Sequence, residues 1–205
     1  MRRGKLIVFE GIDGAGKTTQ VRMLFDLLHK SGADVHQFRE PGGTEVGEKV
    51  RGVLLARREI ETDLDPVAEF LLFAAARREL VRNKLRPLLD GGATVLLDRF
   101  GDSSVAYQGY GRGVDVEFIR GINRYVTEGL DPDRGILLDL DPAIARARVG
   151  AGTDRLESGG EPFFRRVREG YLEIARGDPE RYRVIDAARP PEEVFRDVVR
   201  ALEGV

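Results

Sequence analysis

Residues 11–18 read GIDGAGKT; they follow the apolar run LIVF at residues 6–9 and precede a stretch with helical patterning. The spacing GxxxxGK[ST] between a strand and a helix is typical of a phosphate-binding P-loop. Its glycines let backbone N–H groups surround a polyphosphate at the positive end of the following helix. In this pattern Lys17 reaches the β- and γ-phosphates and the Thr18 hydroxyl ligates Mg²⁺. The alternative, a glycine-rich turn that binds nothing, is disfavoured by the strand before it and the helix after it.

The composition narrows the chemistry further. The 205 residues include no cysteine and two histidines, which excludes disulfides, thiolate zinc sites and a catalytic thiol, and disfavours a histidine-based metal site. The net charge of −2 gives no sign of a nucleic-acid partner. The apolar run near the start ends at Glu10, too short for a secretory signal or a membrane span. We therefore expect one domain over residues 1–205, in the cytoplasm and without a membrane partner.

Short apolar runs alternate with helical patterns along the chain, which is typical of a parallel α/β sheet. The apolar character of the runs is nearly continuous, as in strands that helices cover on both faces. We expect strands at residues 5–10, 34–39, 94–98, 135–139 and 183–186. We expect helices at about residues 17–30, 47–57, 66–89, 116–128, 142–148, 162–176 and 191–202.

Local signals support several of these boundaries and indicate one mobile element. Asp65 and Asp141 each stand before a proline, the arrangement of a capping residue and the first position of a helix. Glycines flank an arginine-bearing segment between residues 150 and 160. This pattern predicts a movable lid at about residues 149–160.

Charged residues follow three of the expected strands at their carboxyl ends, where an open parallel sheet binds its ligands. The P-loop, with Asp13 inside it, follows the first strand, and the sequence REPGGT at residues 39–44 follows the second. Asp98 ends the third, and Arg99 follows it directly. Asp98 is a candidate Walker-B-like acid for magnesium, and Arg99 a candidate bidentate clamp for phosphate. A simple ion pair at the end of a strand is the alternative for both.

Three further sets of residues have two interpretations each. Phe73 and Arg77 share a helix face, so the ring could stack on a base and the guanidinium could bond the edge of that base. From the spacing alone, a Phe73 in the core and a solvated Arg77 are the more ordinary outcome. The stretch at residues 102–113 is either the wall of a polar pocket or a surface loop. Arginines near the lid could stabilise a transferring phosphate on closure, whereas those at residues 165–168 fit a solvated helix face.

Taken in order, the motifs of this chain resemble the thymidylate kinase family from about residue 5 to the C-terminus. They are FEGIDGAGKTTQ (9–20), REPGGT (39–44), FAAAR (73–77), DRF (98–100), SSVAYQGYGRG (103–113), DRLE (154–157) and YLEIA (171–175). EPGGT is the most discriminating, because P-loop proteins at large do not share it. The resemblance implies an α/β P-loop nucleoside monophosphate kinase fold, a five-stranded parallel sheet flanked by helices with a small lid, usually assembled as a homodimer. It implies Mg²⁺-dependent phosphorylation of dTMP by ATP to give dTDP, which supplies dTTP for DNA synthesis.

The resemblance also implies roles for individual residues. Asp13 meets the 3′-hydroxyl and phosphate region of dTMP, Arg99 grips its phosphate, and Tyr107 presses against the sugar. Phe73 stacks on thymine, Arg77 bonds its carbonyl edge, Ser104 and Gln108 read the base, and Pro41 and Tyr171 line the same pocket. ATP is bound by Gly11, Ile12, Asp13, Gly14, Ala15, Gly16, Lys17, Thr18, Thr19 and Arg146. The catalytic set is Lys17, Arg99, Arg148, Arg155 and Asp13. The metal is held by Thr18 and Asp98.

One feature divides the family that the chain resembles. Some members carry an arginine inside the P-loop, where this chain has Gly14 and Ala15. Members without it supply basic residues from the lid, and Arg146, Arg148 and Arg155 are all candidates for that role.

Other functions compete with this one. A P-loop kinase with a different acceptor is the nearest alternative, and the base-pocket motifs disfavour it. A GTP-binding switch would need a guanine-reading Asn/Thr-Lys-x-Asp segment, which none of the five lysines provides. A catalytically inactive nucleotide-binding module is disfavoured because Lys17, Thr18, Asp98 and Arg99 are all present.

Overall fold

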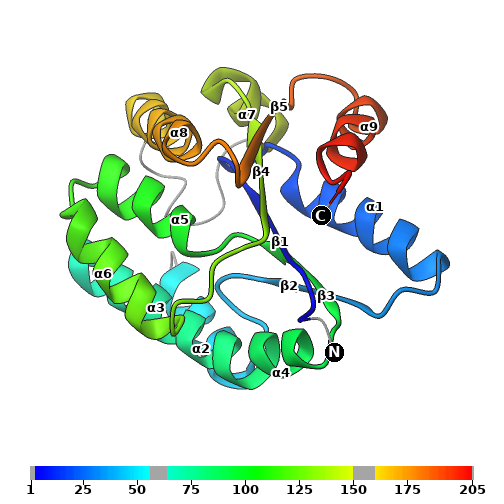
Figure 1. The fold of residues 1–205 in the computed structure, drawn as a ribbon. Helices are drawn as coiled ribbons and strands as arrows, with labels where there is room; N and C mark the ends of the chain where they lie inside the picture. Colours follow the sequence, from blue (N-terminus) through cyan, green and yellow to red (C-terminus); the bar gives the residue numbers. More distant parts are fainter. Residues whose placement is uncertain (1–2, 56–63, 150–159, 205) are drawn as a thin grey trace.

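A computed structural model of the chain describes residues 3–55, 64–149 and 160–204. Within them, five parallel strands form one sheet in the spatial order β2-β3-β1-β4-β5 (Figure 1). The strands are β1 (Leu6–Glu10), β2 (Val35–Arg39), β3 (Thr94–Asp98), β4 (Arg134–Asp139) and β5 (Tyr182–Asp186). All five expected strands are present, and the parallel α/β class is confirmed.

Helices lie on both sides of the sheet, with α1 and α9 together on one side and α3, α6 and α8 on the other (Figure 1). The α-helices are α1 (Lys17–Lys30), α2 (Glu45–Leu55), α3 (Pro66–Leu80), α4 (Arg86–Asp90), α5 (Gly101–Ser104), α6 (Val116–Val126), α7 (Pro142–Val149), α8 (Gly160–Gly177) and α9 (Pro191–Ala201). Two π-helical segments are η1 (Val81–Leu85) and η2 (Val105–Gly111). No helix in these described ranges is long and apolar enough to cross a bilayer.

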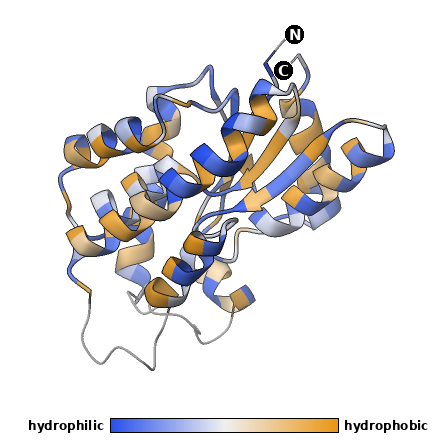
Figure 2. Cartoon of the chain, turned by 90° about the horizontal axis from the view of Figure 1, so that it is seen from below, coloured by the Kyte–Doolittle hydropathy of each residue, from blue (hydrophilic) through white to orange (hydrophobic). Residues whose placement is uncertain are grey.

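Alternate residues of β1 point to opposite faces of the sheet and enter two different hydrophobic clusters. Leu6 and Val8 belong to a cluster with residues of η1 and α4. Ile7 and Phe9 belong to a larger cluster, which includes residues of α1 and α9 and also of α3, α6 and α8. This follows from the two-residue period of a strand, and it explains why β1 is apolar on both faces. In Figure 2 the hydrophobic strands lie between helices that carry both hydrophobic and hydrophilic residues.

The two edge strands differ from the central ones. β1 is buried throughout, but β2 and β5 contain exposed residues, among them Gln37 and Val184. The expectation that all strands are covered on both faces is therefore wrong for the edges. Each edge strand has a neighbouring strand on one side only, and its sequence already carries polar residues, VHQFR and YRVID.

The long helix expected at residues 66–89 is interrupted by the π-helical η1, whose widened turn has the N–H of Arg86 donating to the carbonyl of Val81. Pro87 follows directly. A proline lacks the N–H for a regular helical bond, and its ring would collide with the carbonyl four residues earlier, so a widened turn relieves both conflicts. The start of the helix is as expected, because the Asp65 carboxylate accepts from the N–H groups of Val67 and Ala68.

Residues 101–111 are helical and largely buried, not a surface loop. Their glycines indicated a loop because glycine is a poor helix former. In the fold they are required by close packing: a Cβ at Gly111 would lie 2.6 Å from the ring of Phe163 on α8. This buried helical turn faces the carboxyl ends of the strands and forms one wall of the site.

Candidate active site

The P-loop connects β1 to α1 and needs its glycines. Gly14 and Gly16 have φ angles of 82° and 91°, which side chains other than glycine rarely adopt. A Cβ at Gly14 would also lie 2.7 Å from the carbonyl oxygen of Ala145 on α7. At these two positions the loop presents only backbone, which suits phosphate binding by N–H groups.

Lys17 is buried at the start of α1 and folds back over the loop. Its Nζ donates to the carbonyls of Gly11 at 3.0 Å and Ile12 at 2.9 Å. Burial and the nearby positive charge of Arg99 lower the pKa of Lys17 to about 8. An anion in the loop would favour the charged form, so phosphate binding and protonation of Lys17 support one another.

Thr18 and Asp98 come together from elements 80 residues apart in the chain. The Thr18 hydroxyl donates to the Asp98 carboxylate at 2.6 Å, because the end of β3 lies beside the end of β1. Hydroxyl and carboxylate oxygens are donors that Mg²⁺ prefers, so this pair fits the ion. Groups of three or more His, Cys, Asp or Glu side chains that could hold a metal are absent from the described residues.

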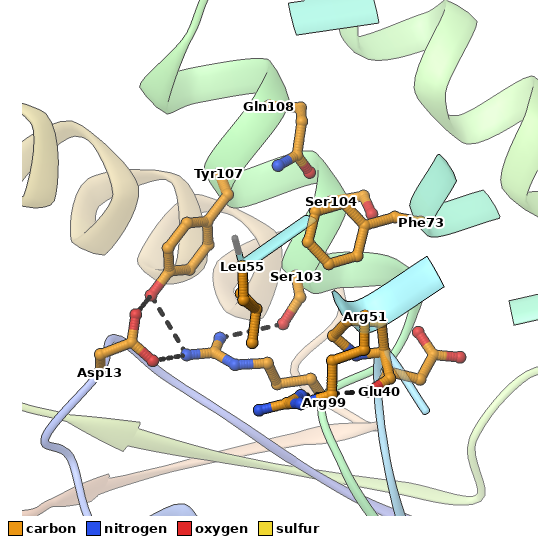
Figure 3. A pocket seen from close by; sticks show the side chains of 11 residues that line it. Asp13, Glu40, Arg51, Leu55, Phe73, Arg99, Ser103, Ser104, Tyr107 and Gln108 are labelled. Carbon is orange, nitrogen blue, oxygen red and sulfur yellow. Dashed lines mark hydrogen bonds and ion pairs between the residues drawn. The ribbon is translucent and has the colours of Figure 1, made fainter. Parts of the chain in front are cut away.

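Arg99 lies at the centre of the site, directly after β3, with its guanidinium held between several side chains (Figure 3). One of its nitrogens donates to Asp13 at 2.5 Å and to the Tyr107 hydroxyl at 3.2 Å. The Tyr107 hydroxyl itself donates to Asp13 at 2.8 Å. Burial would raise the pKa of Asp13, but the positive charges of Arg99 and Lys17 outweigh it and lower that pKa to about 2. Asp13 is thus a permanent anion across the physiological pH range.

The other terminal nitrogen of Arg99 donates to the Gly11 carbonyl at 3.1 Å, the Tyr171 hydroxyl at 3.0 Å and the Ser103 hydroxyl at 3.2 Å. Both hydroxyls also bond Glu10, the buried last residue of β1. Burial raises the pKa of Glu10 to about 7. The guanidinium therefore has neutral or anionic acceptors on both of its terminal nitrogens.

Two adjoining hollows open along these residues. One runs along the P-loop and is lined by Asp13, Gly14, Gly16, Lys17, Thr18, Thr19, Arg39, Glu40, Arg51, Asp98 and Arg99. The other is drawn in Figure 3 and is lined by Asp13, Glu40, Pro41, Arg51, Leu55, Phe73, Arg99, Ser103, Ser104, Tyr107 and Gln108. Four residues belong to both linings: Asp13, Glu40, Arg51 and Arg99. Two cations and two carboxylates thus stand where the hollows meet.

Phe73 and Arg77 lie on the same helix, α3, but their side chains have different environments. The ring of Phe73 lines the second hollow (Figure 3), whereas Arg77 is 1% exposed and lies behind the wall. The Arg77 guanidinium donates to Glu40 at 2.7–2.8 Å, to Asn123 at 2.6 Å and to Ser104 at 3.1 Å. The alternative of a solvated Arg77 is therefore wrong.

The remaining pocket residues come from several elements. Ser104 and Gln108 are buried on consecutive turns of the α5–η2 segment, and the Gln108 amide donates to Glu69 at 2.9 Å. Pro41 lines the hollow from the loop after β2. Tyr171, on α8, does not line it; the side chain touches the site through Arg99 and Ser103.

The arginines expected near the lid fall partly outside the described residues. Arg148 on α7 donates to the Gly14 carbonyl at 3.5 Å and the Ala188 carbonyl at 3.2 Å, and so bridges the P-loop and the loop after β5. Arg146 is exposed on the same helix. Arg155 and most of the expected lid lie outside the described residues.

The sequence interpretation missed several residues of the site, among them Arg51, Leu55 and Glu10. Arg51 and Leu55 stand four and eight positions after Gly47 on α2, so they share the face that follows the REPGGT loop. That spacing could have identified them. Glu10 gave no signal of its own, because it is simply the polar residue that ends an apolar run.

A phosphate-binding loop that shares two cations with an adjoining aromatic and polar pocket defines a P-loop phosphotransferase with a small-molecule acceptor. Comparisons with known proteins agree. A thymidylate kinase family model matches residues 9–198. The chain is 49% identical to a thymidylate kinase of Pelotomaculum thermopropionicum, covering 99% of this chain and 94% of that protein, and 46% identical to one of Deinococcus radiodurans, covering 98% of each. The crystal structure of thymidylate kinase from Ehrlichia chaffeensis superposes with a TM-score of 0.82 at 34% identity, covering 98% of this chain and 99% of that one. The chain therefore belongs to the thymidylate kinase family, and its activity is the phosphorylation of dTMP.

Proposed function

We propose that ATP occupies the hollow along the P-loop and dTMP the adjoining pocket, and that the γ-phosphate passes between them at the shared residues. The observation that carries this assignment is the common boundary of the two linings, Asp13, Glu40, Arg51 and Arg99. A phosphoryl group in transfer spreads its charge over its outer oxygens, so cations are needed at the junction. Arg51 and Arg99 are the cations that stand there.

In the transfer, an oxygen of the dTMP phosphate attacks the γ-phosphorus of ATP, the bond to the β-phosphate oxygen breaks, and ADP leaves. The acceptor phosphate has a second pKa of about 6 and is mostly dianionic at neutral pH, so no general base is required. Lys17 and the N–H groups of residues 11–19 hold the donor phosphates, and Arg99 holds the acceptor phosphate.

The second pocket suits a deoxynucleotide with a flat base. Phe73 provides a ring on which the base stacks, and Ser104 and Gln108 offer polar groups to its edge. Arg77, whose guanidinium bonds Ser104 and Glu40 at this wall, is the proposed partner of the carbonyl edge of thymine. The Tyr107 ring stands over the guanidinium of Arg99, 4.9 Å from ring centroid to the guanidinium carbon. In the proposed complex this ring presses against the sugar where a ribose 2′-hydroxyl would sit. Pro41 closes the pocket, and Tyr171 acts from behind Arg99.

Magnesium is the proposed cofactor. Thr18 and Asp98 would hold it, directly or through water, with phosphate oxygens of ATP completing the shell. When bound, the ion neutralises charge on the β- and γ-phosphates.

We further propose that residues 1–205 form a single kinase domain whose lid, at about residues 149–160, supplies the catalytic cation. The crowding of Gly14 against α7 supports this, because an arginine could not replace Gly14 without moving that helix. Arg148 already reaches the P-loop carbonyl of Gly14, and Arg146 and Arg155 are the other candidates.

A homodimer and a cytoplasmic location complete the proposal. Exposed apolar side chains stand on three neighbouring helices, α2, α3 and α6, which gives a second copy an apolar face to cover. These residues are Val46, Val53, Val67, Leu71 and Phe118.

The first test is ADP release by the purified protein with ATP and Mg²⁺, comparing dTMP with dUMP, dCMP, dGMP, dAMP and UMP. We expect a strong preference for dTMP, with UMP rejected because of its 2′-hydroxyl. Better turnover of another monophosphate would mean that the base pocket is assigned wrongly although the P-loop assignment stands. ATP binding without turnover of any acceptor would contradict the kinase assignment.

A further inference from the structure

Glu10 ends β1 as a completely buried carboxylate with 0% exposure, yet it lines neither hollow. Three donors reach it. The Phe100 N–H donates to Oε1 at 2.8 Å, and the hydroxyls of Ser103 and Tyr171 donate to Oε2 at 2.5 and 3.0 Å. All three donors belong to groups next to Arg99 in the chain or in contact with its guanidinium. A buried carboxylate is costly unless such bonds compensate it, so its place here needs a reason.

The reason lies in the number of protons on the two hydroxyls. Each hydroxyl has one hydrogen to donate and two lone pairs that accept. Ser103 and Tyr171 both accept from the same Arg99 nitrogen, at 3.2 and 3.0 Å. They can do so only when their own hydrogens point away from the guanidinium. Glu10 Oε2 lies within hydrogen-bond distance of both hydroxyls, which also lie 2.8 Å from each other, so at least one hydroxyl hydrogen ends on the carboxylate.

The other carboxylate oxygen acts on the backbone. Arg99 has φ 72°, a left-handed conformation that is uncommon for a residue with a side chain. The N–H groups on its two sides are fixed: its own donates to the Phe9 carbonyl at 3.0 Å, and that of Phe100 donates to Glu10. Glu10 therefore constrains both the backbone and the guanidinium of the same residue.

We propose that Glu10 is a positioning residue that orients Arg99 toward the acceptor phosphate through the hydroxyls of Ser103 and Tyr171. This inference rests on the function proposed above, in which Arg99 holds the phosphate of dTMP. A protonated Glu10 is a weaker acceptor and places its own hydrogen against one of the hydroxyls, so the charge-assisted bonds that orient Ser103 and Tyr171 toward the guanidinium are weakened. Acceptor binding should therefore require the ionised carboxylate.

The charges around Glu10 come from every element packed on it. Arg99 and the Ser103 hydroxyl favour the anion, and Asp102 on α5 opposes it. Lys17 faces it from α1, and the hydroxyls of Tyr171 and Tyr182 face it from α8 and β5. Burial is the largest influence, and it raises the pKa of Glu10 to about 7, so its ionisation falls within the pH range of an ordinary assay.

The test is Glu10→Gln, which keeps the shape and still accepts from Phe100 but presents N–H groups to the two hydroxyls. We expect the KM for dTMP to rise about tenfold, as for loss of an oriented bond to a charged group, with the KM for ATP within about twofold. In the wild type, log(kcat/KM) for dTMP plotted against pH should have a limiting slope of two on the acid side. Two groups must lose a proton there, the acceptor phosphate and Glu10. In the variant the slope should be one, because the phosphate of dTMP, with a second pKa of about 6, still titrates.

A second variant and a ligand-free measurement separate this role from general damage. Asp102→Asn removes a charge that raises the pKa of Glu10, so the enzymatic limb should move to lower pH while the slope stays at two. ¹⁵N signals of the Arg99 guanidinium, recorded without substrate, should be sharp in the wild type and exchange-broadened in Glu10→Gln. Equal slopes in wild type and Glu10→Gln, parallel rises in both KM values, or unchanged guanidinium signals would overturn the inference. Failure of the wild type to use dTMP would instead refute the proposed function, and the guanidinium signals would still test the positioning role.

Discussion

Arg99 concentrates the unusual features of the site in one residue. It combines a left-handed backbone, a guanidinium bonded on both terminal nitrogens, and a place where two hollows meet. Backbone strain of this kind costs about 1–3 kcal/mol and persists only where the surroundings enforce it. Here the surroundings are the buried acid of β1 and the anionic Asp13. The arrangement holds a cation in place before any phosphate arrives.

Glu10 should reduce the stability of the fold as pH rises, independently of its effect on catalysis. Its pKa is raised from 4.5 to about 7, so its contribution to stability is complete below pH 4.5 and is lost as pH rises through 7. The shift corresponds to about 3 kcal/mol of unfolding free energy. Asp13, with its pKa near 2, and Lys17, with its pKa near 8, act in other pH ranges.

Urea unfolding of the wild type and of Glu10→Gln between pH 4 and 8 measures this effect. We expect the wild type to lose the stability given above relative to the variant across that range. A constant difference between the two proteins would show that Glu10 keeps its ordinary pKa in the fold. The expected loss would show that the site combines a carboxylate needed for function with a cost to the fold.

At the scale of elements, the closest contact in the wall of the pocket is between α8 and η2. A Cβ at Gly170 on α8 would lie 2.6–2.8 Å from three atoms of Tyr110, including its own Cβ. Because that atom is next to the backbone, Gly170→Ala must push η2 away and cannot be relieved by rotating a side chain. We expect a loss of about 1–3 kcal/mol in unfolding free energy, and a raised KM for dTMP because η2 carries Tyr107 and Gln108.

Gly177→Ala, at the end of the same helix, is the matched control. No atom lies within 4 Å of a Cβ there, so the change should be neutral or stabilise by up to about 1 kcal/mol. Thermal unfolding and dTMP kinetics of both variants decide the matter. Equal behaviour of the two alanines would show that the contact with Tyr110 is not tight.

The same elements show what the sequence could and could not predict. The strands and the P-loop follow from short-range patterns, since an apolar run and a fixed glycine spacing are local properties. The η2 helix was not predictable, because the need for Gly111 comes from Phe163, more than 50 residues further along the chain. Arg77 was placed on the correct helix, but its burial depends on Glu40 and Asn123 from other elements. Glu10 shows the limit most clearly, since all three of its donors lie at least 90 residues away.

For the whole molecule, the apolar face on α2, α3 and α6 leads to a prediction about assembly. Leu71 is 45% exposed on α3 and lies among the other residues of that face. If a second copy covers it, Leu71→Asp should convert a dimer into monomers, because a buried carboxylate without a partner is strongly disfavoured. Sedimentation equilibrium of the wild type and of Leu71→Asp measures the oligomeric state of each.

Val184→Asp provides the control, since Val184 is 51% exposed on the edge strand β5, away from the proposed face. It should leave the oligomeric state unchanged. A wild-type monomer, or a dimer that tolerates Asp at position 71, would contradict the proposed interface.

The position of β1 has a consequence for synthesis of the chain. β1 is made first, yet it lies in the middle of the sheet and pairs with β3 and β4, as in Leu6 with Val95 and Ile7 with Arg134. During synthesis on the ribosome, nearly half of the chain must be made before β3 can pair with β1. About two thirds must be made before β4 can pair with its other edge. During that interval an apolar strand with both edges open is the segment most prone to misassociation. Newly made chains should therefore depend on chaperones until β4 has emerged, and acquire the ability to bind phosphate late and abruptly.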